Sequence, residues 1–225
     1  MLKNMVWARD CDEFTLGELA ALGRVVALTQ GESVIARGRK TDQLGLVLSG
    51  ILKLSATCCK GSRHIAGYMR AGDLFNQLPV FDGGGSAYDY DAKTDLAIAY
   101  FDRSSIFQLM GRDANFSLVM ARSLCARARR HHRDLIKVCL LPLRERCALS
   151  IIELAEQFGI STTDAATPSF RLAQQALADM VGCSRPILNK ELKALEKLGF
   201  IAIANCNITI TDLPGLGAVA CRHHL

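Results

Sequence analysis

The sequence predicts an α+β chain whose first half is rich in β-strands and whose second half is helical. In the first half, short runs of Val, Ile, Leu and aromatic residues alternate with glycines, a spacing typical of a β-barrel or β-sandwich. In the second half, apolar residues recur at helical spacing from Ser105 to about Leu141. A pair of shorter helices and a strand hairpin are expected after them.

The strands of the first half are expected to be short and separated by tight turns. The apolar runs that predict them cover residues 24–30, 32–38, 44–50, 51–57, 63–69 and 95–101. Glycines lie between most of these runs, where they permit sharp turns. The glycine-rich segment 82–86 is interpreted as a loop, because it lacks the Gly-Lys-Ser/Thr ending with which a P-loop holds nucleotide phosphates.

Two helices are predicted between Ser105 and Leu141, a short one and then a long one from about Asp113 to Val138. With a rise of about 1.5 Å per residue, the long helix measures about 39 Å, more than a small domain needs. Positions 116, 120, 124, 127, 131, 135 and 138 form a mostly apolar seam that resembles a coiled coil, although Arg127 and His131 weaken it. We therefore expect a homodimer built on this helix; the alternative is a long core helix in a monomer.

The composition narrows the classes to which the protein can belong. Of the 225 residues, 50% are hydrophobic and 22% are charged, which excludes a wholly disordered chain. The net charge of +5 lies mostly in the second half: residues 1–112 carry 13 basic and 12 acidic side chains, and residues 113–225 carry 14 and 10. A basic second half favours an anionic partner such as nucleic acid.

Other classes are not expected because their sequence signals are missing. No apolar run approaches the roughly 18–20 residues that cross a bilayer, and the first residues contain no signal-peptide core. We therefore expect a cytoplasmic protein without a membrane partner. The sequence contains no HExxH motif, Walker motif or nucleophile–base pattern, so neither an enzyme nor a metal site is predicted.

One further helix is expected between the long helix and the helix pair. Pro142 ends the long helix, and the amphipathic segment 143–159 is predicted to be helical, with Gly159 as its C-terminal cap. The polar segment 160–169 is interpreted as a loop and 170–172 as a short strand.

A helix-turn-helix pattern follows this region. The first helix is expected from Gln174 to Val181, and Gly182 supplies a tight turn. The second helix runs to about Leu198. Ser184 is a favourable N-cap for it, and Pro186 is tolerated in its first turn because the missing N–H needs no partner there.

The second helix of the pair carries the residue types that read DNA. A major groove admits one α-helix, whose first exposed side chains reach the base edges. Arg185 can bond guanine through two hydrogen bonds, Asn189 can pair with adenine, and lysines suit phosphates. The predicted DNA-binding residues are Gln174, Ser184, Arg185, Pro186, Asn189, Lys190 and Lys193. A hairpin over 200–211 would form a wing; the alternative is an amphipathic helix pair with a solvated polar face.

The segment MVGCSRPILNKELKALEKLGFI (180–201) resembles the winged helix of the cyclic AMP receptor protein and FNR family of transcription regulators. In the first half, GESVIARG (31–38), LGLVLSGILKL (44–54) and RAGDLFNQLPVFDG (70–83) are similar to its barrel motif, its central hairpin and the entry to its effector cassette. The segment 141–159 resembles the helix that opens the family's DNA-binding domain.

This resemblance implies a three-part organisation. It comprises an N-terminal β-roll of the cyclic-nucleotide-binding jelly-roll type over 1–112, a dimerisation helix over 113–140 and a C-terminal winged helix-turn-helix over 141–225. It also implies a homodimer that binds palindromic double-stranded DNA and that contacts RNA polymerase if it is an activator.

The effector cassette departs from the form found in members that bind cyclic AMP. Those members hold the ribose with a Glu and the phosphate with an Arg-Ser pair, where this sequence has Gln77, Ser86 and Ala87. We therefore expect an effector other than cyclic AMP, and the effector and any cofactor stay open. The predicted effector pocket consists of Leu74, Asn76, Gln77, Leu78, Ser86, Ala87, Arg127, His131 and His132.

Two alternative sensing chemistries keep the same DNA-binding output. A thiol-redox regulator would use Cys58-Cys59 or the pair Cys125 and Cys139, whereas a haem-based regulator would use a histidine such as His64. An iron–sulfur cluster is poorly supported because Cys11 is the one cysteine near the N-terminus. Most of the nine cysteines are expected to be reduced and buried. An interaction module without DNA binding is a further alternative.

Overall fold

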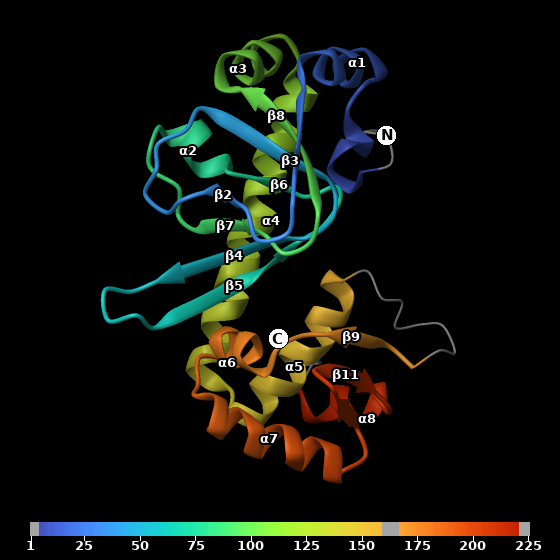
Figure 1. Cartoon of the computed structure of the whole chain (residues 1–225). Helices are drawn as coiled ribbons and strands as arrows, with labels where there is room; N and C mark the ends of the chain where they lie inside the picture. Colours follow the sequence, from blue (N-terminus) through green and yellow to red (C-terminus); the bar gives the residue numbers. More distant parts are fainter. Residues whose placement is uncertain (1–4, 159–166, 221–225) are drawn as a thin grey trace. The chain divides into compact units, whose positions relative to one another are not determined.

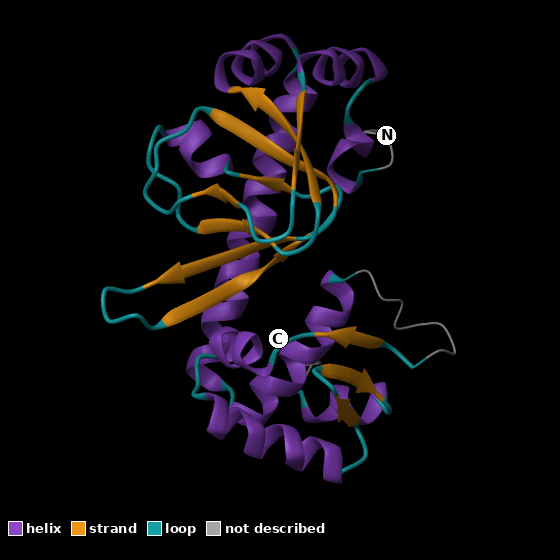
Figure 2. Ribbon diagram, viewed as in Figure 1, coloured by secondary structure: helices purple, strands orange, loops and turns teal. Residues whose placement is uncertain are grey.

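The computed structural model describes residues 5–158 and 167–220 (Figures 1 and 2). The chain forms two compact units: residues 1–56 with 69–131, called the first unit here, and residues 57–68 with 132–225, called the second unit. Within the described residues, no helix is long and apolar enough to cross a membrane.

The strands of the β-rich half form two four-stranded antiparallel sheets (Figure 2). One sheet has the order β1-β8-β3-β6 and the other β2-β7-β4-β5. The strand bounds are β1 Arg24–Leu28, β2 Ser33–Ile35, β3 Gln43–Ser49, β4 Leu52–Thr57, β5 Arg63–Met69, β6 Leu74–Phe75, β7 Asp89–Ala92 and β8 Leu96–Asp102. All six predicted strands are present; β6 and β7 were not predicted, because a two-residue strand and an Asp-rich strand lack the apolar pattern.

Helices lie before, between and after these strands, and the last of them, α4, continues past residue 131, where the first unit ends. Their bounds are η2 Val6–Asp10, α1 Glu13–Leu22, α2 Gln77–Asp82, α3 Arg103–Arg112 and α4 Ala114–Leu140. The predicted short and long helices correspond to α3 and α4, and the break between them is at Asp113. The Asp113 carboxylate accepts hydrogen bonds from the N–H groups of Asn115 and Phe116 and from the Thr15 hydroxyl of α1. The Thr15 hydrogen bond in particular lowers the pKa of this carboxyl.

The start of α4 belongs to the core of the first unit. Phe116, Val119 and Met120 are buried in one apolar cluster with residues of β3, β8, α1 and α3. The predicted seam is therefore wrong at positions 116 and 120, because both side chains are buried in the core of their own chain and cannot contact a second copy. The later seam positions Leu135 and Val138 are exposed.

The second unit holds the helix pair and a small sheet. Its elements are α5 Leu143–Gln157, β9 Ser169–Arg171, α6 Gln174–Val181, α7 Arg185–Lys197, β10 Ile201–Ala204, β11 Asn207–Ile210 and α8 Leu213–Val219. The predicted cap Gly159 and most of the predicted loop 160–169 lie outside the described residues. The predicted hairpin is present, but β9 pairs with β11, so the sheet is three-stranded in the order β10-β11-β9.

Most of the described cysteines are not core residues, so the expectation that they are buried is wrong. Cys147 is buried, and Cys11 and Cys183 are partly buried. The exposed cysteines are Cys58, Cys59, Cys125, Cys139 and Cys206. The thiols of these eight described cysteines are all free.

Candidate nucleic-acid interface and effector site

The turn between α6 and α7 is fixed by a glycine in the left-handed conformation. Gly182 has φ 77°, a value at which a β-carbon would be strained. The N–H groups of Gly182 and Cys183 both donate to the carbonyl of Ala178, at 2.9 and 3.1 Å. This capping closes α6 and reverses the chain within a few residues, so that α7 begins at Arg185.

The inner face of α7 anchors the helix in the second unit. Leu188, Leu192 and Leu195 are each at most 1% exposed, at the helical spacing predicted from the sequence. They pack in a core to which α5 contributes the fully buried Ile151 and Ile152. This apolar face sets which side chains of α7 point to solvent.

The predicted DNA-binding residues lie mostly on the outer face of α7. Ser184, Arg185, Pro186, Lys190 and Lys193 are exposed, while Gln174 and Asn189 are partly buried. Ser184 occupies the N-cap position as predicted, although its side chain makes no capping hydrogen bond. The hydroxyl of Ser184 is therefore available to another acceptor or donor.

Asn189 presents only part of its amide to solvent. Its Oδ1 atom is buried and has no hydrogen-bond partner among the described residues. A bidentate pairing with adenine needs both the oxygen and the nitrogen of the amide. In this conformation Asn189 cannot make that pairing, and its side chain would have to turn outward when DNA binds.

The acidic side chains of α7 are engaged by neighbouring elements. Glu191 accepts a hydrogen bond of 2.8 Å from the Arg144 guanidinium of α5, and Glu196 accepts one of 2.9 Å from the backbone N–H of Ile203 in β10. The lysines Lys190 and Lys193 remain exposed. Arg144 therefore compensates the charge of Glu191, whereas Glu196 keeps its charge, and the sequence pattern reveals neither contact.

The changed cassette residues of the first unit bond within the protein. Gln77 is buried and its Nε2 donates to the Ser123 hydroxyl of α4 at 2.9 Å. The buried Ser86 hydroxyl donates to the Tyr88 carbonyl at 2.7 Å. Asn76, also buried, has φ 61° and donates from Nδ2 to the Gln43 carbonyl at 2.7 Å. These hydrogen bonds tie the cassette to neighbouring segments, while the Oδ1 atom of Asn76 is buried without a partner among the described residues.

Other predicted effector residues are exposed in a single chain. Leu78, Ala87, His131 and His132 all face solvent. The ring of His131 stacks on Tyr88 with a centroid distance of 6.4 Å. The structure thus does not gather all nine predicted effector residues in one cavity.

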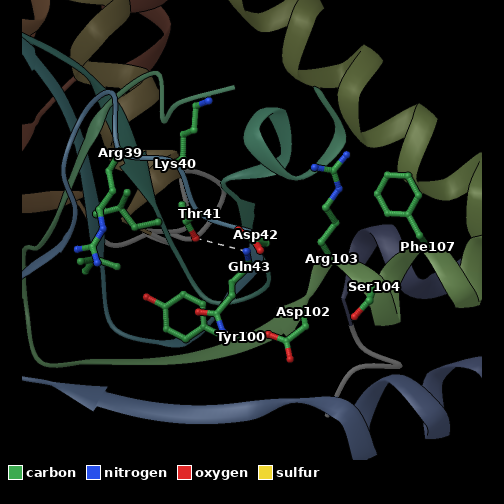
Figure 3. A pocket seen from close by; sticks show the side chains of 12 residues that line it. Arg39, Lys40, Thr41, Asp42, Gln43, Tyr100, Asp102, Arg103, Ser104 and Phe107 are labelled. Atoms are coloured by element: carbon green, nitrogen blue, oxygen red, sulfur yellow. Dashed lines mark hydrogen bonds between the residues drawn. The ribbon is translucent and has the colours of Figure 1, made fainter. Parts of the chain in front are cut away.

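A polar cleft of about 780 Å³ lies beside the start of α3 (Figure 3). It is lined by β2, by the segment 39–43, by the end of β8 and by the first turn of α3. Arg103 packs over the Phe107 ring at 5.2 Å, and Gln43 donates to the Asp102 carboxylate at 3.0 Å. None of the nine predicted effector residues lines this cleft.

A second cavity, of about 660 Å³, is lined by the N-terminal segment, by the turn after β5 and by α4. Leu74, Gln77 and Arg127 of the predicted effector pocket line it. Arg127 donates from Nη2 to the Tyr90 hydroxyl at 3.2 Å, whereas its Nη1 is buried without a partner among the described residues. Three of the nine predicted residues therefore share this cavity.

The described residues bring together no group of three or more His, Cys, Asp or Glu side chains that could hold a metal ion.

One thiol has a lowered pKa. Cys58 lies exposed at the turn between β4 and β5, where backbone N–H groups of Lys60 and then Ser62 lower its pKa by hydrogen bonding to the sulfur.

Comparison with known families identifies both parts of the chain. The model of the cyclic nucleotide-binding domain matches residues 25–113, and that of the Crp-like helix-turn-helix domain matches residues 145–219. A β-roll of this type followed by this helix-turn-helix defines a class, the transcription regulators with a cyclic-nucleotide-binding-type domain. The chain belongs to the cyclic AMP receptor protein and FNR family of these regulators.

Relatives of the chain carry different functional names. The CRP-like cAMP-activated global transcriptional regulator of Mycobacterium tuberculosis is 26% identical over 83% of this chain and 84% of its own length. The global nitrogen regulator of Nostoc is 21% identical over 83% of this chain and 84% of its own length. The solved structure of the c-di-GMP-responsive regulator CLP of Xanthomonas campestris has a TM-score of 0.77 and 20% identity, covering 88% of this chain and 99% of that one.

Proposed function

We propose that this regulator is a homodimer that binds a palindromic DNA operator through α7 and responds to an effector other than cyclic AMP. The exposed side chains of Arg185, Lys190 and Lys193 on α7 carry the proposal, together with the pairing of Glu191 with Arg144. The proposed parts are a sensor over 1–112, a dimerisation helix over 113–140 and a DNA-binding domain over 141–225. An activator of this kind would also contact RNA polymerase.

The end of α4 supports the proposed dimer. Leu135, Ile136, Val138 and Leu140 are 41–72% exposed although they are apolar. Leu135 and Val138 lie three residues apart and so share one side of the helix, and a second copy of the same helix would bury them. Such a dimer presents two α7 helices to two half-sites, as a palindromic operator requires.

Light scattering is expected to give a mass of about twice 24.5 kDa. Leu135→Glu should shift the protein toward monomer, because a carboxylate would be buried in an apolar contact. Leu22→Glu is the matched control, since Leu22 is also exposed but lies on α1. A monomer at micromolar concentration, or equal effects of the two substitutions, would contradict the proposed contact.

Arg185→Ala is expected to weaken binding to the preferred operator by about 1–3 kcal/mol and to relax the preference at one base pair. Lys193→Ala should weaken binding to all sequences about equally and reduce the salt dependence, because a phosphate contact carries no sequence information. Fluorescence anisotropy with specific and scrambled duplexes separates these effects. Uniform losses in both variants would show that Arg185 does not read a base.

Thiol sensing is a second candidate for the input, favoured by the lowered pKa of the exposed Cys58. A lower pKa increases the thiolate fraction near neutral pH, and the thiolate is the form that peroxide oxidises to a sulfenic acid. Haem sensing has no comparable observation in its support.

Peroxide is expected to change the DNA affinity of the wild-type protein and to leave that of Cys58→Ser unchanged, with dithiothreitol reversing the effect. Cys59→Ser is the matched control, because Cys59 is the adjacent thiol and is also exposed. The measurement is operator affinity before and after oxidation. If Cys58→Ser keeps the full response, the sensing thiol is not Cys58.

A further inference from the structure

The cavity of about 660 Å³ in the first unit has the size of a small-molecule site. Pockets that bury small ligands measure about 300–1,000 Å³ and combine an apolar lining with a few polar groups. All residues that line this cavity belong to the first unit. The proposed function leaves the effector open, and this cavity offers a place and a chemistry for one.

One wall of the cavity is apolar. Leu74 and Val119 are buried and line it together with Leu48 and Trp7. The indole Nε1 of Trp7 donates to the Gly72 carbonyl at 2.9 Å, which fixes the orientation of the ring. The wall can therefore bury the apolar body of a ligand against side chains that are already ordered.

The polar wall of the cavity carries an excess of positive charge. Its charged side chains are Arg70, Arg122, Arg127, Arg130, Asp10 and Asp73. The Asp10 carboxylate forms an ion pair with Arg122 at 2.9 Å, and that of Asp73 accepts the backbone N–H of Arg70 at 2.8 Å. Beyond the ion pair of Arg122 with Asp10, the guanidinium groups of Arg127 and Arg130 make this wall attractive to an anion.

Arg127 has a buried hydrogen-bond donor that lacks an acceptor among the described residues. Its Nη2 donates to the neutral Tyr90 hydroxyl, and its Nη1 is shielded from solvent with no acceptor among the described residues. A buried donor without an acceptor is costly, and a guanidinium satisfies two donors at once with an oxyanion. Arg127 lines the cavity, so an oxyanion bound there would lie beside its side chain.

We propose that this cavity binds a small organic anion, whose oxyanion head group pairs with Arg127 and whose apolar body packs against Trp7, Leu48 and Leu74. The ligand would contact α4 directly. The same helix ends in the exposed apolar segment of the proposed dimer contact, so the ligand could act on the proposed output. Binding itself does not depend on that output and can be measured without DNA.

Trp7 is the single tryptophan of the chain, so its fluorescence reports on this cavity. The probe is anilinonaphthalene sulfonate, an amphipathic anion, and its neutral counterpart phenylnaphthylamine lacks the sulfonate. We expect saturable energy transfer from Trp7 to the sulfonate probe. Arg127→Gln should lower the affinity for the sulfonate probe at least about tenfold, which is the lower range for a charge-assisted hydrogen bond. It should lower the affinity for the neutral probe by less than about twofold.

Two further variants keep the test decisive. Arg39 lines the polar cleft and not this cavity, so Arg39→Gln should leave the affinity for both probes unchanged. Ala126→Phe should exclude both probes by filling the cavity, and it provides the test if Arg127→Gln does not fold. Transfer that does not saturate, equal weakening of both probes by Arg127→Gln, or undiminished binding to Ala126→Phe would overturn the proposal. A protein that binds DNA but fails these tests would keep the proposed function and lose the anion site.

Discussion

Neither cyclic AMP nor cyclic GMP is expected to bind this protein below about 50 µM. A cyclic phosphate carries a negative charge, and its burial needs a charged partner. At the position that the resemblance assigns to that arginine, the chain has Ser86, whose hydroxyl already donates to the Tyr88 carbonyl. A neutral donor in this position cannot replace a guanidinium, which offers a charged fork of donors.

The cassette residue Gln77 is expected to lower the affinity for a cyclic nucleotide further. The resemblance assigns Gln77 to the position of the family's ribose-binding glutamate, and its amide N–H donates to the Ser123 hydroxyl. The nearby carboxylates of Asp89 and Asp91 are disfavoured neighbours for a phosphate, although Asp91 is partly neutralised by Lys53 at 2.9 Å. A combined loss of about 4 kcal/mol would move a micromolar ligand into the millimolar range.

Isothermal titration calorimetry with each nucleotide tests this expectation. The cAMP-activated regulator of Mycobacterium tuberculosis is the positive control under the same conditions. Dissociation constants below about 50 µM for this protein would contradict the prediction. They would also indicate that another arginine, such as Arg63 or Arg127, had taken over the phosphate.

Leu192→Ala is expected to destabilise the second unit by about 2–5 kcal/mol, the usual range for deleting a buried leucine side chain. Leu192 is 1% exposed and lies between Leu188 and Leu195 on the face that anchors α7. The cavity left behind would loosen the helix that presents the DNA-binding side chains. Operator affinity should therefore fall even at temperatures where the variant is still folded.

Leu198→Ala is the matched control for this substitution. Leu198 immediately follows α7 but is 54% exposed, so its truncation should change the stability by no more than about 0.5 kcal/mol. Urea unfolding followed by circular dichroism compares the two variants. Equal stability of Leu192→Ala and Leu198→Ala would mean that the buried face of α7 does not hold the helix in place.

Much of the architecture follows from short-range patterns. Strands β1 to β5 and β8 were predicted because each is an apolar run bounded by glycine or polar residues. The boundaries of α6 and α7 follow from Gly182 and Ser184, which are a C-terminal and an N-terminal signal respectively. The order of the elements and their relation to a known family also come from the sequence.

The structural features that the sequence pattern does not predict depend on tertiary contacts. The buried state of Phe116 and Met120 cannot be read from helical periodicity, because a core face and a dimer seam share the same spacing. In β3, Gly45 is required because a β-carbon there would lie 2.1 Å from the Phe75 ring of β6, a strand that the pattern did not predict. The engagement of Glu191 and Glu196 likewise appears only when α7 lies beside α5 and β10.

Selection of duplexes from a random DNA pool tests the central claim, that this protein is a dimeric sequence-specific DNA-binding regulator. We predict enrichment of an inverted repeat whose half-sites lie about 10–10.5 base pairs apart or a multiple of that distance, as two α7 helices on one face of the duplex require. Arg185→Ala should lose the preference at one symmetric pair of positions within that repeat. Retention of DNA without enrichment of any sequence, or enrichment of a single unrepeated site, would contradict the account.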